Sequence, residues 1–167
     1  MSGALIVTAA LGAEDFAWLD AQRRAHFPPE RNILAAHLTM FHALPPSCEA
    51  EAGRVLAREA AAPPPRATIA GLMNLGRGVA YRIVSDDLEA IRRSVAEQFH
   101  GLLTAQDSQG WRPHVTIMNK AEPAAAKALL RDLEAKFQPR PLRIAGLELN
   151  RYLGGPWERL GRWSFRG

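Results

Sequence analysis

The sequence predicts an α+β fold of two pseudo-symmetric lobes, each a mostly antiparallel sheet with helices on its outer face. The first observation behind this prediction is that each half of the 167-residue chain reads as strand, helix, strand, helix, strand. The second is that the middle strand of each half carries the same pattern, His-Leu-Thr at 37–39 and His-Val-Thr at 114–116. An internal repeat of about 3–75 and 78–153 therefore predicts one bilobal domain over 1–167, with the His-x-Thr strands lining a central cleft.

In the first half, short apolar runs predict strands, and charged, alanine-rich segments predict helices. The three prolines at 63–65 end the second helix, because proline lacks the amide hydrogen that a helix interior needs. The predicted strands are 4–10, 33–41 and 67–75, and the predicted helices are 14–26 and 48–62.

In the second half, Ser85 or Asp86 is the expected N-cap of one helix, and proline stands at the first position of the next. The Gly-Gly-Pro sequence at 154–156 predicts a turn, after which an edge strand pairs back on the preceding strand. The predicted strands are 79–84, 113–118, 141–153 and 157–166, and the predicted helices are 87–103 and 123–137.

Composition sets limits on the class of protein. The chain is 47% hydrophobic and 23% charged, which is typical of a globular domain, and no apolar run is long enough for a membrane helix. Lys and Arg exceed Asp and Glu by 21 to 17, which favours anionic partners, phosphate in particular. Cys48 is the only cysteine, so an intramolecular disulfide and a cysteine-built metal site are excluded. We expect a monomeric, cytoplasmic protein without a membrane segment.

The two His-x-Thr strands are the candidate chemical site. Side chains alternate along a strand, so each histidine lies beside its threonine on one face, while the intervening apolar residues pack on the other. Two imidazoles across a cleft suit phosphodiester chemistry, because one can take a proton from the attacking hydroxyl while the other protonates the leaving oxygen. Each threonine hydroxyl can donate to a non-bridging phosphate oxygen. No metal is required for this chemistry.

The acidic residues support an anionic substrate by their positions. No Asp or Glu lies between Glu30 and Glu49, or between Asp107 and Glu122, so both motifs are locally cationic. Carboxylates usually orient metal-binding histidines, so the absence of Asp and Glu near both motifs argues against a metal centre built from histidines. The alternative to an enzyme is a non-catalytic module that uses the cleft to bind an RNA end or a nucleotide.

The paired tetrapeptides His-Leu-Thr-Met and His-Val-Thr-Ile, with Arg112-Pro113 before the second, resemble the 2H phosphoesterase superfamily, in its 2′-5′ RNA ligase-like branch. The ending 149–158 (LNRYLGGPWE) is similar to the tail of bacterial members. The resemblance implies that His37 and His114 are the catalytic pair and that Thr39 and Thr116 hold the phosphate. It further implies hydrolysis of 2′,3′-cyclic phosphates at RNA or nucleotide ends, or cleavage and joining of 2′-5′ linkages, with no metal and no cofactor.

Several further residues are interpreted from their positions. Phe41 lies four residues after the first histidine, so we expect its ring on the same strand face; there it either stacks on a nucleobase or is a core phenylalanine at the end of the strand. Of Arg151 and Tyr152, one is expected to reach the groove, depending on a bulge at Gly146. Trp157 is interpreted as a packing residue. Three other histidines are interpreted as surface or capping residues: His26, His42 and His100.

Overall fold

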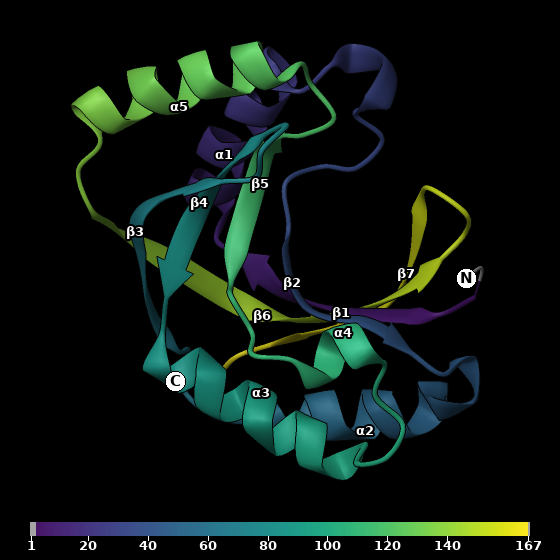
Figure 1. The fold of residues 1–167 in the computed structure, drawn as a ribbon. Helices are drawn as coiled ribbons and strands as arrows, with labels where there is room; N and C mark the ends of the chain where they lie inside the picture. The colour runs from purple at the N-terminus through teal and green to yellow at the C-terminus, as the bar shows by residue number, and fades with distance from the viewer. Residues whose placement is uncertain (1–2, 167) are drawn as a thin grey trace.

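The structure is a computed structural model that describes residues 3–166. Its secondary structure follows the predicted alternation of strands and helices (Figure 1). The strands are β1 (Leu5–Leu11), β2 (Leu38–Leu44), β3 (Arg66–Asn74), β4 (Val79–Val84), β5 (His114–Met118), β6 (Arg140–Tyr152) and β7 (Trp157–Ser164). The helices are α1 (Ala13–His26), α2 (Glu49–Glu59), α3 (Asp86–Gln98), α4 (Ala105–Ser108) and α5 (Pro123–Lys136), with short 3-10 turns η1 (Pro29–Arg31) and η2 (Pro46–Cys48).

The strands form antiparallel pairs in the order β2-β1-β6-β3-β4-β5, with β7 also paired to β6. The long strand β6 belongs to both halves of this arrangement. Its first four residues, Arg140–Arg143, pair with β3, and residues 144–151 pair with β1. The fold is α+β, as predicted, and β6 joins the two lobes of the sheet.

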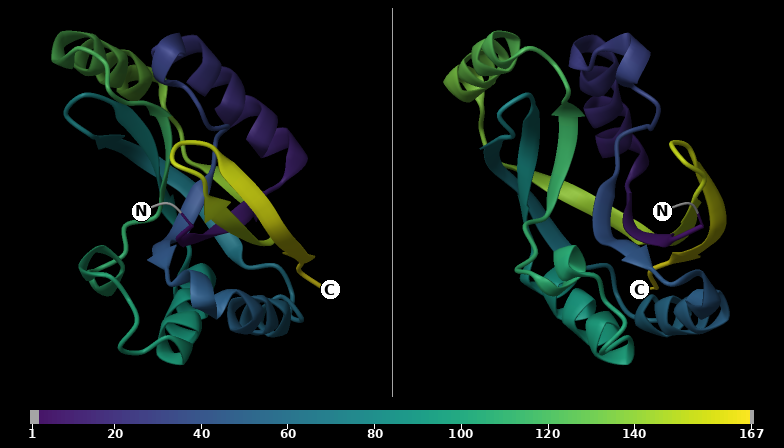
Figure 2. Two further views of the ribbon diagram at one scale, coloured as in Figure 1. Left: turned by 90° about the vertical axis from the view of Figure 1, so that its right-hand side faces the viewer. Right: turned by 45° about the vertical axis from the view of Figure 1, so that its right-hand side comes forward.

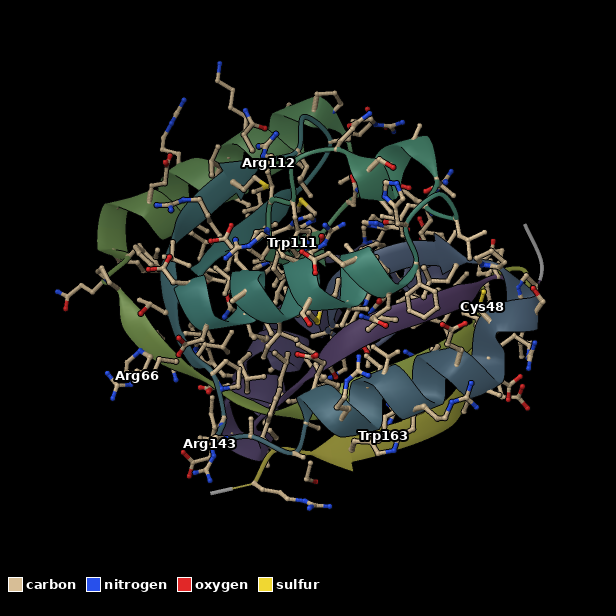
Figure 3. The ribbon with its side chains drawn as sticks, turned by 90° about the horizontal axis from the view of Figure 1, so that it is seen from below. Cys48, Arg66, Trp111, Arg112, Arg143 and Trp163 are labelled. Atoms are coloured by element: carbon tan, nitrogen blue, oxygen red, sulfur yellow. The ribbon has the colours of Figure 1, made fainter. Side chains whose placement is uncertain are left out.

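Helices cover each lobe on its outer side (Figure 2). Helices α1 and α5 pack on the lobe of β3, β4 and β5, while α2 packs on β6 and β7 and also contacts α3. Trp163 of β7 lies beside α2 (Figure 3), with its ring 3.6 Å from where a Cβ at Gly53 would be. Helix α1 follows β1 in the chain but packs on β5 of the other lobe. The two halves of the chain are therefore interlocked.

The core explains why these segments form strands. Every residue of β1 is buried, and the apolar residues Leu38 of β2 and Val115 and Ile117 of β5 are fully buried. At the start of α3, Ser85 is the N-cap and accepts a hydrogen bond from the Leu88 amide at 3.0 Å. No helix in the described part of the chain is long and apolar enough to cross a membrane.

Two predicted elements differ most in extent from the observed ones. The strand predicted at 33–41 begins only at Leu38 and continues to Leu44, because the preceding loop is held by α1 and does not pair with a strand. The helix predicted at 87–103 ends at Gln98, and Gly101 takes a left-handed conformation (φ 83°) before the short helix α4.

Register shifts interrupt several strands, and those in β2 and β6 bear on the cleft. Thr39 of β2 is paired with Thr8 and Phe41 with Val7, so Met40 is an extra residue in the register. In β6, Gly146 is paired with Ala10 and Ile144 with Leu11, which places a bulge beside Gly146. A bulge reverses the alternation of side chains beyond it, which matters for the site that β2 helps to form.

Candidate active site

The structure places His37 immediately before β2 and His114 at the start of β5, and both side chains line one cavity of about 390 Å³. Thr39 and Thr116 line the same cavity. The two histidines are 77 positions apart in the chain. The fold nevertheless brings them and the two threonines together across the cleft.

The two imidazoles are held in the same way. Nδ1 of His37 lies 2.8 Å from the carbonyl oxygen of Ala35, and Nδ1 of His114 lies 2.7 Å from that of Arg112. A carbonyl oxygen only accepts hydrogen bonds, so Nδ1 carries the hydrogen in both rings. This tautomer leaves Nε2 of each neutral ring as the atom that can accept a proton.

Helix α1 fixes both histidine strands from one side. The Asp20 carboxylate accepts a hydrogen bond from the Ala36 amide at 2.9 Å, just before His37. Arg23 donates to the Asn32 side chain at 2.8 Å and to the carbonyl oxygen of Thr116 at 3.2 Å. Because Arg23 is buried, one guanidinium connects the loop before the first motif to the strand of the second.

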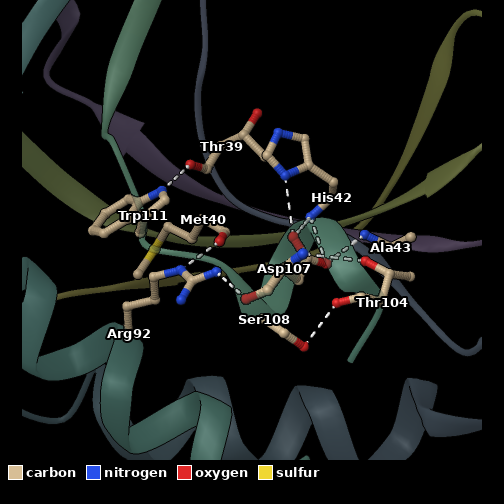
Figure 4. A network of polar contacts seen from close by, with 9 residues as sticks. All are labelled: Thr39, Met40, His42, Ala43, Arg92, Thr104, Asp107, Ser108 and Trp111. Atoms are coloured by element: carbon tan, nitrogen blue, oxygen red, sulfur yellow. Dashed lines mark hydrogen bonds and ion pairs between the residues drawn. The ribbon is translucent and has the colours of Figure 1, made fainter. Parts of the chain in front are cut away.

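Residues of α3 and of the segment after it fix β2 from the other side (Figure 4). Arg92 donates to the carbonyl oxygens of Met40 and Asp107, at 2.9 and 2.8 Å. Trp111 donates from its indole nitrogen to the carbonyl oxygen of Thr39 at 3.0 Å. Arg23 and Arg92 thus each bind the backbone of the motif strand that belongs to the other half of the chain.

The buried carboxylate of Asp107 anchors the same wall of the cavity. It accepts hydrogen bonds from the backbone amides of His42 (2.8 and 3.0 Å) and Ala43 (3.0 Å), and lies 3.1 Å from Nδ1 of His42. Burial alone would raise the pKa of Asp107, but these hydrogen bonds and the proximity of His42 lower it below its usual value. Asp107 is therefore ionised at neutral pH.

Burial also sets the charge of His37. Loss of solvation lowers its pKa to about 4, and the nearby charges of Arg23, His114 and His42 act in the same direction, against the hydrogen bond to Ala35. His37 is consequently neutral at pH 7, with the lone pair of Nε2 available.

Trp157, at the start of β7, packs edge-on against the His37 ring, with 4.7 Å between ring centroids. Its packing role was expected, but its partner was not. His37 and Trp157 also line a second cavity of about 470 Å³, whose wall includes Glu148, Arg159 and Arg162. Glu148 there accepts hydrogen bonds from Thr8 at 3.0 Å and pairs with Arg159 at 2.8 Å.

None of the three expected substrate-binding residues is among those that line the cavity of the two histidines. Phe41 is completely buried beneath the Arg92 guanidinium, because the bulge at Met40 turns its ring into the core. Of the two interpretations of Phe41, the open stacking ring is therefore wrong and the core phenylalanine is confirmed. Arg151 forms ion pairs with Glu49 and Glu158. Neither Arg151 nor Tyr152 is among the described residues that line either cavity.

Sequence reasoning missed most of the cavity wall. His42 was interpreted as a surface or capping residue, but its side chain lines the cavity, because the bulge brings it to the face where Phe41 was expected. Of the other lining residues, the sequence singled out only Arg112, before the second motif, and Trp157, as a packing residue. The remaining ones belong to no motif: Ile6, Arg92, Gln106, Gln109, Gly110 and Trp111. Within residues 3–166, no Asp or Glu lines this cavity, and no group of three or more His, Cys, Asp or Glu is placed to hold a metal ion.

A family model described as the 2′-5′ RNA ligase superfamily matches residues 12–156, which include both histidine motifs. The chain belongs to this superfamily. Membership in the 2′-5′ RNA ligase superfamily, which is a group of 2H phosphoesterases, supports a phosphoesterase or RNA ligase-like function. A search of curated proteins found no match.

Solved structures share the fold of this 2′-5′ RNA ligase superfamily member. TT0787 of Thermus thermophilus is 18% identical with a TM-score of 0.68, and the match covers 98% of each chain. E. coli LigT, solved in complex with 3′-AMP, is 19% identical with a TM-score of 0.65, and the match covers 100% of both chains. A structure described as a phosphoesterase is 18% identical with a TM-score of 0.67 over 100% of each chain. E. coli LigT has also been solved with NADP+.

Proposed function

We propose that the protein is a metal-independent phosphodiesterase that hydrolyses 2′,3′-cyclic phosphate ends of RNA or nucleotides by general acid/base catalysis. The observation that carries the proposal is the common setting of the two imidazoles. Each is fixed through Nδ1 by a backbone carbonyl two residues earlier, and each lines one cavity beside a threonine. The expectations of a monomeric, cytoplasmic enzyme without a cofactor go with this proposal.

The charge of His37 supports a division of roles. Because its lowered pKa keeps it neutral at pH 7, Nε2 of His37 is suited to take the proton from the attacking water. The new bond forms between that water oxygen and phosphorus, and the bond from phosphorus to one ribose oxygen breaks. His114 then donates the proton that this ribose oxygen needs, and the product is a phosphomonoester. A 2′-5′ RNA ligase activity would use the same groups with a 5′-hydroxyl in place of water: the 5′-oxygen forms the new bond to phosphorus, and the bond from phosphorus to the ribose 3′-oxygen breaks.

The threonines complete the proposed site. Thr39 and Thr116 donate their hydroxyl hydrogens to the non-bridging oxygens, whose charge grows in the transition state. By comparison with single oxyanion-hole donors, loss of either hydroxyl is expected to lower kcat about 10²-fold.

The test is turnover of 2′,3′-cyclic mononucleotides, cyclic-ended RNA and 2′-5′ dinucleotides in the presence of a chelator, with the products identified by mass spectrometry. We expect His37→Ala and His114→Ala each to lower kcat by about 10² to 10⁴, as for removal of a general acid or base. His100→Ala, on the exposed surface, is the control and should keep full activity. Binding without product from any of these substrates would select the non-catalytic module instead.

A further inference from the structure

A third imidazole lines the reaction cavity, and the proposed hydrolysis does not use it. His42 of β2 lies between the two lobes on the cavity wall with its side chain 41% exposed. Its Nδ1 lies 3.1 Å from the carboxylate of Asp107, whose side chain is fully buried (Figure 4). A carboxylate accepts hydrogen bonds, so Nδ1 carries a hydrogen and Nε2 is the ring atom left for a ligand. Nε2 has no hydrogen-bond partner among the described residues.

The imidazole ring is not needed to hold the chain in place. Asp107 binds the backbone amides of His42 and Ala43, and almost any residue at position 42 would supply the same amide. Asp107 instead orients the ring and gives it an ion-pair partner when the ring is protonated. This arrangement fits a side chain that binds an anion.

The charge of the cavity exceeds what one cyclic phosphate needs. A cyclic phosphodiester carries one negative charge, and in the proposed mechanism it lies between the two catalytic histidines and their threonines. Arg92 and Arg112 line the cavity together with His42, and no described Asp or Glu lines it. The wall that carries His42 thus has positive charge and a hydrogen-bonding group for a second anionic group.

We propose that His42, oriented by Asp107, binds a second phosphate of the substrate, the one on the 5′-oxygen of the terminal nucleotide. The inference rests on the proposed function, which places the scissile phosphate between His37 and His114. It implies that the preferred substrate has a phosphate on each side of the terminal ribose, as an RNA end or a 5′-phosphorylated nucleotide does. A lone nucleoside 2′,3′-cyclic phosphate lacks the second phosphate.

The experiment compares two unreactive product-like ligands, adenosine 2′-monophosphate and adenosine 2′,5′-bisphosphate, by calorimetry. We expect the wild-type protein to bind the bisphosphate about tenfold more tightly, as for one hydrogen bond between charged groups. His42→Ala should reduce this preference to less than about twofold, and His42→Gln should keep part of it. His100→Ala should behave as wild type. In NMR spectra, the ring signals of His42 should shift with the bisphosphate and not with the monophosphate.

The outcomes separate the inference from the function on which it rests. An equal affinity of the wild-type protein for both ligands, or a preference that persists in folded His42→Ala, overturns the role of His42 and leaves the proposed function standing. A preference that depends on His42, in a protein that turns over no cyclic phosphate, retains the second phosphate site and rejects the hydrolase. Failure of the wild-type protein to bind either ligand rejects both.

Free nucleotides and RNA ends are then distinguished by kcat/KM for 5′-phosphorylated 2′,3′-cyclic AMP and for a cyclic-ended trinucleotide. Each is compared with 2′,3′-cyclic AMP, in the wild-type protein and in His42→Ala. An advantage of either substrate that is lost in His42→Ala supports the inference, and the larger advantage identifies the source of the second phosphate. No advantage for either substrate contradicts it.

Discussion

The pKa of His37 lies well below the usual value of a histidine. Its pKa of about 4 arises first from burial and then from the positive charges nearby. If Nε2 of His37 is the general base, activity requires the neutral ring. We therefore predict that the acid limb of kcat/KM lies near pH 4, which a pH profile with a cyclic mononucleotide measures. An acid limb at 6.5, the value of an unperturbed histidine, would contradict this assignment.

The same burial links His37 to stability. The folded state has the lower pKa, so the neutral ring contributes stability that is fully present above about pH 6.5 and is lost as the pH falls towards 4. The free energy of unfolding of the wild-type protein should therefore fall between pH 6.5 and pH 4. We predict that this fall is smaller in His37→Gln, by on the order of 1 to 3 kcal/mol. Urea unfolding at pH 7 and pH 4.5 measures it. An identical pH dependence in both proteins would show that His37 is not buried as a neutral group.

Sequence patterns predicted that the two histidines and two threonines share a cavity, because alternation along a strand is a local property. They failed at Phe41 and His42 because one extra residue, Met40, reverses that alternation, and nothing in the local composition reveals the bulge. Arg92 and Trp111 were beyond reach for another reason. They bind backbone carbonyls of a strand more than 50 positions away in the chain. Periodic patterns in the sequence relate only residues that are close in the chain, so they do not predict such contacts.

At the scale of elements, strands and helices were predicted well where a proline, a cap or a fully apolar run marks them. The proline at the start of α5 and the Ser85 cap of α3 are examples. The start of β2 was misplaced because an apolar loop, held by hydrogen bonds to α1, has the composition of a strand.

The turn between β3 and β4 allows a test of close packing beside the second motif. A Cβ at Gly78 would lie 1.9 Å from the carbonyl oxygen of Met118, on the strand that begins with His114. We predict that Gly78→Ala destabilises the protein by about 2 kcal/mol or more, because backbone must move to make room. Thermal unfolding measures the effect. Gly110→Ala is the matched control, since a Cβ there meets no atom within 4 Å, and equal melting temperatures for the two variants would refute the prediction.

At the scale of the whole molecule, the strand exchange between halves decides how the chain folds. Strand β3, which ends the first half, pairs with β4 and β6 of the second half. Strand β6 of the second half pairs in turn with β1 of the first half. We propose that the halves are repeats, as the sequence predicts. If the halves were separated, the strands of the first half would lose their pairing with β6, and β6 would lose its pairing with β1 and β3. We predict that fragments 1–76 and 77–167 are unfolded separately and regain structure only when mixed. Circular dichroism of each fragment and of the mixture measures this, and a cooperative melt of either fragment alone would contradict it.

Because β6 passes from one lobe into the other, its twist and its bulge beside Gly146 help to set the separation of the lobes. An insertion or deletion at that bulge would therefore change the opening of the cleft.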